Sequence, residues 1–251
     1  MRVQTGDNVG IGGFIIAGSA PKRVIVRAVH CMICVPEIIP LADPVLELHG
    51  PSGFATIIND NWRDTQEAEI IATGVAPDND SDSAIVVTLP PGNYTAIVRG
   101  KNNTSGVALV EVYDLSQAAA SKLANISTRA FSSTGGDILI AGFILGNGTM
   151  PGNVIVRGIG PSLAGLGVPN ALADPTLELR NSNGGLILAN NNWQDNPAQA
   201  ALITAAGLAP TNPLEAAIAA TLSPGSYTAL LAGLNNGTGV GLVEVYDRGA
   251  P

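Results

Sequence analysis

The chain has 251 residues, more than most single domains, so two domains of about 100–150 residues are expected. Its formal net charge is −8, from 12 basic and 20 acidic residues. Such a charge repels nucleic-acid phosphates and anionic lipid headgroups, which excludes a nucleic-acid partner. Only 13% of the residues are charged, while 30 are glycine and 17 proline, a composition typical of short strands joined by many turns.

Targeting signals are missing from the sequence as it stands. Residues 1–7 lack the apolar core of a signal peptide, and no run of 18 apolar residues predicts a membrane span. A piece of a longer secreted protein would show the same features. The cellular location therefore has to be inferred from other evidence.

Most of the secondary structure predicted in the first half is strand. Residues 107–113 show the pattern well, because Ala108, Val110 and Val112 share one face and Glu111 lies on the other. This alternation is typical of a half-buried strand. The remaining strands, which are rich in β-branched residues and bounded by Pro, Gly or Asn, are expected at 23–26, 84–89 and 94–99.

One short helix is predicted in each half. In the first half, Asp64 is the expected N-cap, Glu67 completes a capping box, and Gly74 stops the helix. In the second half the corresponding residues are Asp195 or Asn196 as the cap, Pro197 and Gly207. Strands with one crossover helix predict a mainly all-β fold, namely two tandem β-sandwiches with jelly-roll-like connectivity.

The second half of the sequence repeats the first. Matching motifs return in the same order, with an offset that drifts only from 129 (142 − 13) to 133 (247 − 114). A period near 130 residues is too long for a solenoid repeat of roughly 20–50 residues, so each copy should be an independent domain. We predict module 1 at residues 1–115, a linker at 116–122 and module 2 at 123–251. The matching pairs are 13–16 and 142–145, 24–27 and 154–157, 42–48 and 173–179, 59–62 and 190–193, 91–96 and 224–229, and 109–114 and 242–247.

The two copies differ at their starts. Module 2 begins with a predicted strand at 123–131, whereas module 1 is expected to lack this first strand. Either the chain was cut from a longer tandem array, or the open edge of module 1 accepts a strand donated by a neighbour.

A family resemblance follows from these motifs. The order Asp-Pro-x-Leu-x-Leu at 43–48, an Asn-rich turn at 59–61 and Leu-x-Pro-Gly-x-Tyr-Thr-Ala at 89–96 resembles the bacterial pre-peptidase C-terminal type of β-sandwich. The fuller pattern also resembles tandem modules of large secreted bacterial proteins. The resemblance implies a non-enzymatic structural or adhesive repeat, secreted or at the cell surface, whose partners are other copies of the module or surface polymers. Carbohydrate binding is the first alternative function, and a calcium-stabilised surface module is the second.

Two cysteines, Cys31 and Cys34, follow His30 in module 1. A structural zinc site needs four ligands, and no second cysteine pair exists. Module 2 has Ile159 to Gly165 at the matching place, so this segment differs between the copies. A Cys31–Cys34 disulfide, a metal or redox site, a divergent loop and a local corruption of the sequence at 30–34 all remain open.

An acidic loop in module 1 is the candidate calcium site. Asp78, Asp80 and Asp82 supply the oxygen ligands that Ca²⁺ prefers. Only the last acid recurs in module 2, as Glu215. The alternative is a solvated turn without bound metal.

The remaining candidates point to structure rather than catalysis. The Asn-rich turns before Trp62 and Trp193 are interpreted as turn formers with an anchoring tryptophan, and sugar stacking is the alternative. Both histidines, His30 and His49, lie in module 1, so no histidine-dependent catalytic set repeats with the module. We therefore expect no enzymatic activity, no catalytic residues and no bound cofactor other than the candidate calcium. The acids that do recur are Asp43 and Asp174, Glu47 and Glu178, Glu111 and Glu244, and Asp114 and Asp247.

Overall fold

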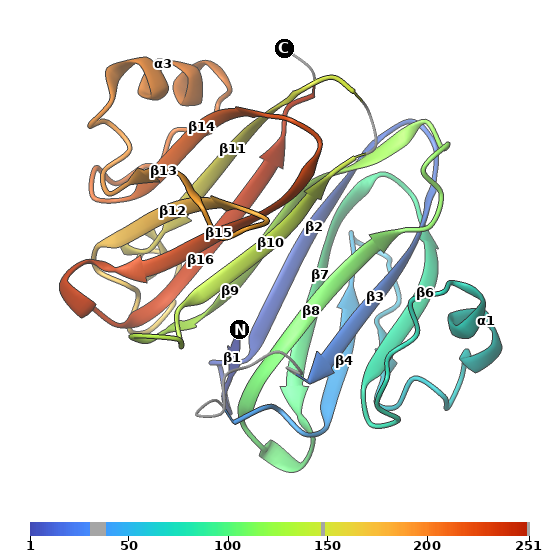
Figure 1. Ribbon diagram of the computed structural model, residues 1–251. Coiled ribbons are helices and arrows are strands. Elements are labelled where there is room, and N and C mark those ends of the chain that lie inside the picture. Colours follow the sequence, from blue (N-terminus) through green and yellow to red (C-terminus); the bar gives the residue numbers. More distant parts are fainter. Residues whose placement is uncertain (31–38, 147–148, 250–251) are drawn as a thin grey trace. The chain divides into compact units, whose positions relative to one another are not determined.

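A computed structural model describes residues 1–30, 39–146 and 149–249 (Figure 1). The described chain is mainly β, with antiparallel strand pairing and a few short helices, as the sequence predicts. It divides into two compact units, Met1–Asn125 and Ile126–Pro251. Within the described residues, no helix is both long and apolar enough to span a membrane.

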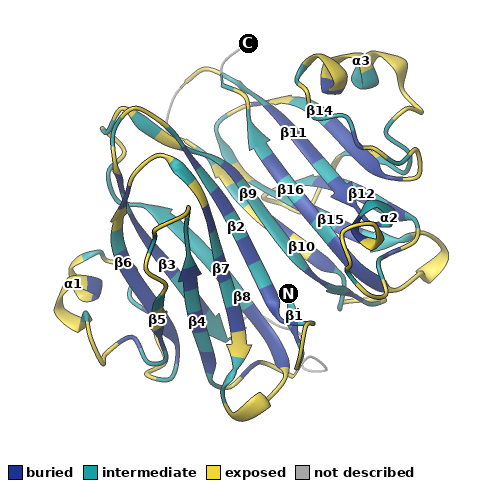
Figure 2. Cartoon of the chain, turned by 180° about the vertical axis from the view of Figure 1, so that it is seen from behind, coloured by how far each residue is buried: buried dark blue, intermediate teal, exposed yellow. Residues whose placement is uncertain are grey.

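Among its described residues, the first unit has eight strands and the start of a ninth. The hydrogen-bonded path runs β5-β4-β7-β2, continues through β9 (Ser121–Ser132), and ends β1-β8-β3-β6. Buried and less buried residues alternate along β2 and β4, as the bands in Figure 2 show. The strands are β1 (Arg2–Val3), β2 (Gly10–Gly18), β3 (Lys22–His30), β4 (Pro44–His49), β5 (Ile57–Asn59), β6 (Ser83–Leu89), β7 (Gly92–Gly100) and β8 (Gly106–Asp114).

The second unit repeats these pairings. One sheet has the order β10-β15-β12-β13, and in the other β11 lies between β14 and β16 while β16 also pairs with β9. The register repeats as well, because Ile25 lies opposite Tyr113 in the first unit and Ile155 opposite Tyr246 in the second. The strands are β10 (Leu139–Leu145), β11 (Gly152–Ile159), β12 (Pro175–Asn181), β13 (Leu186–Asn190), β14 (Ala216–Leu222), β15 (Gly225–Gly233) and β16 (Gly239–Asp247).

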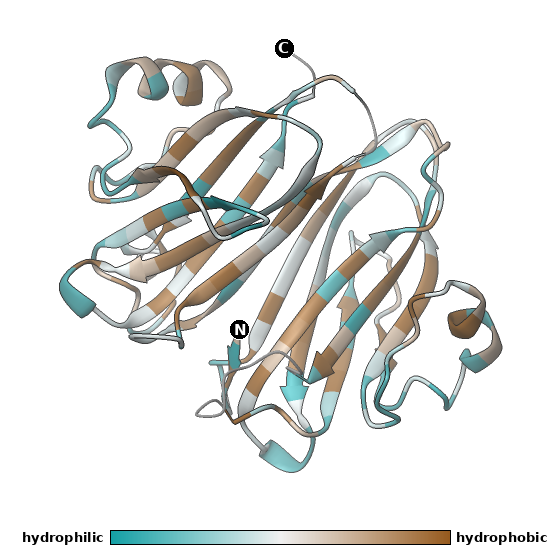
Figure 3. Cartoon of the chain, viewed as in Figure 1, coloured by the Kyte–Doolittle hydropathy of each residue, from teal (hydrophilic) through white to brown (hydrophobic). Residues whose placement is uncertain are grey.

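Each unit has a hydrophobic core between its strands and a smaller apolar cluster beneath a helix. The first core contains Phe14, Leu46 and Val98, all nearly inaccessible to solvent. Brown apolar bands cross the strands in Figure 3. The smaller clusters are Ile25, Trp62, Ile70, Ala84 and Val86 in the first unit and Ile155, Ile203 and Ala217 in the second.

Two of the helices are those that the sequence predicts. Helix α3 (Pro197–Ala205) is capped by Asn196, whose side chain accepts hydrogen bonds from the next turn, so one of the two expected caps is confirmed. Helix α1 (Glu67–Ala72) is different: its N-cap is Gln66, and the prediction of Asp64 was wrong. Asp64 stays in the preceding turn, where it accepts a hydrogen bond from Asn61. A third helix, α2 (Pro161–Ala164), was not predicted.

The start of each unit has the same turn. Gln4 N–H donates to Asn8 O at 2.9 Å, and Ser133 N–H donates to Asp137 O at 2.9 Å. Gly6 and Gly135 both have left-handed φ angles in these turns, 67° and 64°. Strand β1 is thus the two-residue counterpart of the end of β9, and it pairs with β8 at Gly106 and Val107.

The expected linker at 116–122 is only partly a loop. Residues 117–120 form a turn, and β9 begins directly afterwards at Ser121. The boundary between the two compact units falls within this strand, between Asn125 and Ile126. Only residues 121 and 122 of the expected linker therefore belong to strand β9.

Candidate functional site

An arginine, a glutamate and a tyrosine form the same cluster in both units. In the first unit, Arg27 Nε donates to Glu111 Oε2 at 3.0 Å, and Tyr113 OH donates to Glu111 Oε1 at 2.9 Å. Arg27 Nη1 also donates to Val75 O at 2.6 Å. The cluster therefore fastens the segment that follows helix α1 to strands β3 and β8.

The second unit reproduces this arrangement. Arg157 Nε donates to Glu244 Oε2 at 2.8 Å, Tyr246 OH donates to Glu244 Oε1 at 2.9 Å, and Arg157 Nη1 donates to Leu208 O at 3.2 Å. The guanidinium carbon lies 5.4 Å from the centre of the tyrosine ring, within the range of a cation–π contact. Both carboxylate oxygens are engaged, which makes Glu244 and its counterpart Glu111 structural acids.

This environment shifts the ionisation of the tyrosine. Burial, followed by the nearby Glu244 carboxylate, raises the pKa of Tyr246 to about 12. The pKa of Tyr113 is raised for the same reasons. In a protein that unfolds, the freed phenol would ionise near its ordinary pKa of about 10.

We expect a stability change at high pH from this difference. Tyr246 of the folded protein keeps its proton up to about pH 12, whereas the unfolded phenol loses it near pH 10. The contribution of this difference to the free energy of unfolding is therefore fully present below about pH 10 and is lost as the pH rises through 12. Tyrosinate absorbance of folded protein should show a late step that Tyr246→Phe removes. Loss of a step near pH 10 instead would contradict the assignment.

A buried carboxylate recurs at the end of β3 and β11. Asp82 is 1% exposed, and its Oδ1 accepts the His30 N–H at 2.9 Å while His30 Nδ1 lies 3.0 Å away. Glu215, which is fully buried, accepts the N–H groups of Gly160 and Ser162 at 3.3 and 3.0 Å. These acids hold the chain where it leaves the strand.

The candidate calcium loop has its acids turned in different directions. Asp82 contacts His30, whereas Asp80 forms an ion pair with Arg63 at 2.6 Å. An open depression beside them is lined by His30, Asp78, Asn79 and Asp80. No group of three His, Cys, Asp or Glu side chains that could hold a metal occurs among the described residues.

Calcium binding at Asp78, Asp80 and Asp82 stays a prediction, and Arg63 would compete with the ion for Asp80. Ca²⁺ would have to displace Arg63 from Asp80, so Arg63→Ala should enlarge any calcium-induced rise in the melting temperature. Differential scanning calorimetry with CaCl₂ and with chelator measures this effect. Equal melting curves for both proteins under both conditions would contradict calcium binding.

The candidate disulfide partners Cys31 and Cys34 lie outside the described residues.

In each unit, an asparagine of the Asn-rich turn and a glutamine at the start of a helix cover the outer edge of an end strand. In the first unit, Asn59 Oδ1 accepts the Ala84 N–H at 2.9 Å. The Gln66 side chain accepts the Val86 N–H at 3.0 Å and donates to Val86 O at 2.8 Å, much as a neighbouring strand would. Strand β6 is an end strand of its sheet, so these amides satisfy backbone groups that a further strand could otherwise use.

The same device covers β14 in the second unit. Asn190 Oδ1 accepts the Ala217 N–H at 2.9 Å, and Gln199 Oε1 accepts the Ala219 N–H at 3.3 Å. Sequence reasoning singled out the asparagines as turn formers and missed both glutamines. The sequence signal for their role is that a glutamine occurs at matching places in the two copies, at positions 66 and 199.

We expect Gln66→Met to uncover the β6 edge. The variant keeps a side chain of similar length but cannot bond to Val86, so amide exchange of Val86 should become about tenfold faster, the equivalent of one lost hydrogen bond. Hydrogen exchange followed by NMR measures this rate. Gln199→Met is the matched control, with a smaller effect at Ala219 because it removes one longer bond. Unchanged exchange at Val86 would refute the covering role.

Each tryptophan packs against the apolar cluster beneath the helix of its unit. Trp62 is 2% exposed, packs with Ile25 and Ile70, and donates from Nε1 to Asn79 O at 3.1 Å. Trp193 is half-buried and packs against Ile155 and Ile203. The buried ring of Trp62 offers no face for a sugar to stack on, which favours the structural interpretation of the Asn-Trp turn in the first unit.

The other repeated acids also have basic partners in the first unit. Glu47 lies on the outer face of β4, with Arg99 Nε 3.1 Å away. Lys101 Nζ lies 2.7 Å from Asp60 and 3.6 Å from Asp43, and the hydrogen bond that Lys101 donates to Asp60 is the main cause that raises the pKa of Lys101. These ion pairs lie at the surface and give no sign of a paired acid and base.

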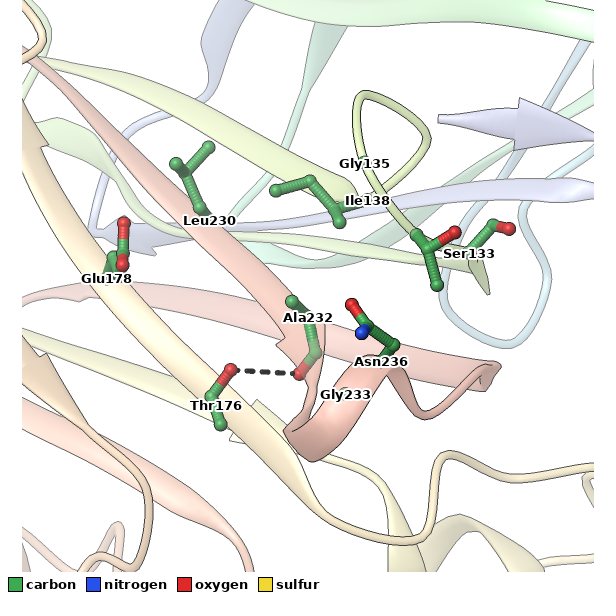
Figure 4. A pocket seen from close by; sticks show the side chains of 10 residues that line it. Ser133, Gly135, Ile138, Thr176, Glu178, Leu230, Ala232, Gly233 and Asn236 are labelled. Atoms are coloured by element: carbon green, nitrogen blue, oxygen red, sulfur yellow. Dashed lines mark hydrogen bonds between the residues drawn. The ribbon is translucent and has the colours of Figure 1, made fainter.

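One shallow pocket lies on the second unit (Figure 4). It has a volume of about 230 Å³, below the roughly 300–1,000 Å³ of usual ligand pockets. Glu178 is its one titratable lining residue among those described, and Arg180 holds this carboxylate at 2.5 Å. Thr176 Oγ1 donates to Ala232 O at 3.2 Å, so one of the pocket's hydroxyl groups is engaged as well.

Comparison of the sequence with models of known protein families and with curated proteins found no match. The class that fold and contacts define is therefore a general one: a duplicated, mainly β protein with antiparallel sheets, in which both copies carry the same stabilising polar clusters.

Proposed function

We propose that the chain is a non-enzymatic structural repeat of a secreted or surface protein, and that each unit is a jelly-roll-like β-sandwich of the pre-peptidase C-terminal type. One observation carries this proposal. Three sets of polar groups that recur in both units, namely the Arg-Glu-Tyr cluster, the buried acid and the Asn and Gln amides, are bonded to the protein's own backbone or side chains. Repetition has retained the residues that hold the fold.

The proposal is supported by the bonding state of each candidate. Asp82 and Glu215 accept backbone N–H groups, and Glu111 and Glu244 use both oxygens on arginine and tyrosine. A catalytic acid or base needs a free position from which to reach a substrate. An adhesive or spacer role requires instead two units that stay folded, which is what these contacts provide.

Force spectroscopy of single molecules tests the spacer role. Two unfolding events are expected, each releasing about 400 Å of chain, since an extended residue spans at most about 3.6 Å. A glycan array tests the carbohydrate-binding alternative. Saturable binding of one glycan, lost on substitution of residues in the pocket of Figure 4, would overturn the structural proposal in favour of that alternative.

A further inference from the structure

Strand β10 is an unusually apolar edge. It ends the hydrogen-bonded path of its sheet in the described part of the second unit. Its sequence from Leu139 to Leu145 has no charged residue and no proline, and Ile140 and Ile144 are 46% and 72% exposed. Edge strands of natural proteins are normally blunted by charge, proline, bulges or a covering element, because free backbone groups recruit another strand.

The other end strands of this fold do show such protection. Strands β6 and β14 are covered by Gln66 and Gln199. Strand β5, which begins the path in the first unit, is only three residues long. Strand β13, at the far end of the β10 sheet, is only five residues long, and its pairing shifts register at Leu179 and Arg180. The bare edge of β10 is therefore an exception within the described chain, and it calls for its own explanation.

The counterpart of β10 in the first unit indicates what this edge binds. Strand β2 pairs with β9, and just beyond β2 the Ser19 N–H donates to Ala120 O at 2.9 Å. Leu123, two residues into β9, packs against the first core. The chain's own segment 120–125 thus lies along the edge that is bare in the second unit.

Burial of the core differs accordingly. Phe14 and Ile16 on β2 are each 1% exposed. Their counterparts on β10, Phe143 and Leu145, are only half-buried. The second core is thus incompletely covered on the side where segment 120–125 closes the first.

We propose that the β10 edge binds the leading strand of a further module, an extended segment with the chemistry of residues 120–125. Backbone hydrogen bonds to β10 supply affinity, and an apolar side chain in the place of Leu123 covers Phe143 and Leu145. The inference deepens the proposed structural role, on which it rests, by naming how successive modules join.

A peptide of residues 116–128, titrated into the whole ¹⁵N-labelled chain, tests the proposal by NMR. Amide signals of β10 should shift in a saturable manner, while those of β13 stay in place. A peptide carrying Leu123→Lys keeps the backbone but loses the apolar contact, and it should bind about tenfold more weakly, in line with one buried leucine.

A matched pair of variants locates the edge. Ile144→Lys puts a charge on β10 and should weaken peptide binding about tenfold or more. Leu186→Lys puts the same charge on β13, where Leu186 is 55% exposed, and should leave binding unchanged. Equal unfolding curves for both variants ensure that the comparison concerns the edge.

Three results would overturn the inference. They are peptide shifts outside β10, equal binding of the Leu123→Lys peptide, and dimerisation of the chain through β10 that excess peptide does not reverse. The last result would mean that β10 pairs with β10 of a second copy of the chain. None of them changes the number of unfolding events under force, so failure here is distinguishable from failure of the structural role.

Discussion

Glu244→Ala is expected to lower the free energy of unfolding of the second unit by about 3–5 kcal/mol, the usual cost of removing one partner of a buried ion pair. The Arg157 and Glu244 side chains are only 19% and 12% exposed. Without the carboxylate, the guanidinium would stay largely desolvated and would keep only neutral contacts, with Leu208 O and with the hydroxyl and ring of Tyr246. The loss of a second bond, from the Tyr246 hydroxyl, adds to the effect.

Urea unfolding followed by circular dichroism measures the change, with two transitions assigned by single-unit substitutions. Glu178→Ala is the matched control, since Glu178 pairs with Arg180 at 2.5 Å but both side chains are more exposed, at 41% and 33%. An exposed pair contributes about 0–1 kcal/mol, so this variant should unfold almost as the unaltered protein does. Similar losses from both variants would mean that burial does not strengthen the cluster.

Ile70→Ala is expected to destabilise the first unit by about 2–5 kcal/mol, the range for removing a buried isoleucine from a packed site. Ile70 is 0% exposed and packs with Trp62 and Ile25 beneath helix α1. The cavity would lie under a helix of only six residues, which has little stability of its own. Gln66, the N-cap, would then lose its fixed position on β6, so exchange of the Val86 amide should rise together with global instability.

The neighbouring residue provides the control. Ile71 is 53% exposed, and Ile71→Ala should change the free energy of unfolding by less than about 0.5 kcal/mol. Both changes remove the same atoms from the same helix, so any difference reports packing alone. If the two variants unfold alike, the packing of Ile70 beneath helix α1 does not stabilise the first unit.

The local features of the fold were predictable from short stretches of sequence. The strand at 107–113 follows from the alternation around Glu111, and it lies within β8. The cap at Asn196 follows from a side chain that bonds only two and three residues ahead. The same reasoning failed at Asp64, because Asn61 engages that carboxylate and Gln66 takes the cap position.

The duplication was also determined by the sequence alone, because two copies carry the same motifs in the same order. It explains why the register of Ile25 with Tyr113 returns as Ile155 with Tyr246. Comparing the copies showed which acids recur, but it could not show what they contact. Asp82 and Glu215 recur at matching positions of the acidic loop, and the structure shows that both accept hydrogen bonds from backbone N–H groups.

Only the tertiary structure decided the roles of Gln66, Arg157 and the β10 edge. Gln66 and Val86 are 20 residues apart, and Arg157 and Glu244 are 87 apart, so no local pattern joins them. A side-chain amide that satisfies a strand edge has no spacing rule, since any loop that returns to the edge can supply it. The bare edge of β10 likewise became apparent only when β10 was compared with its counterpart β2, whose edge is covered. Sequence determined which elements form and that they form twice, because periodicity and capping act over a few residues, whereas long-range pairing decided which edges are closed and which remain open to a partner.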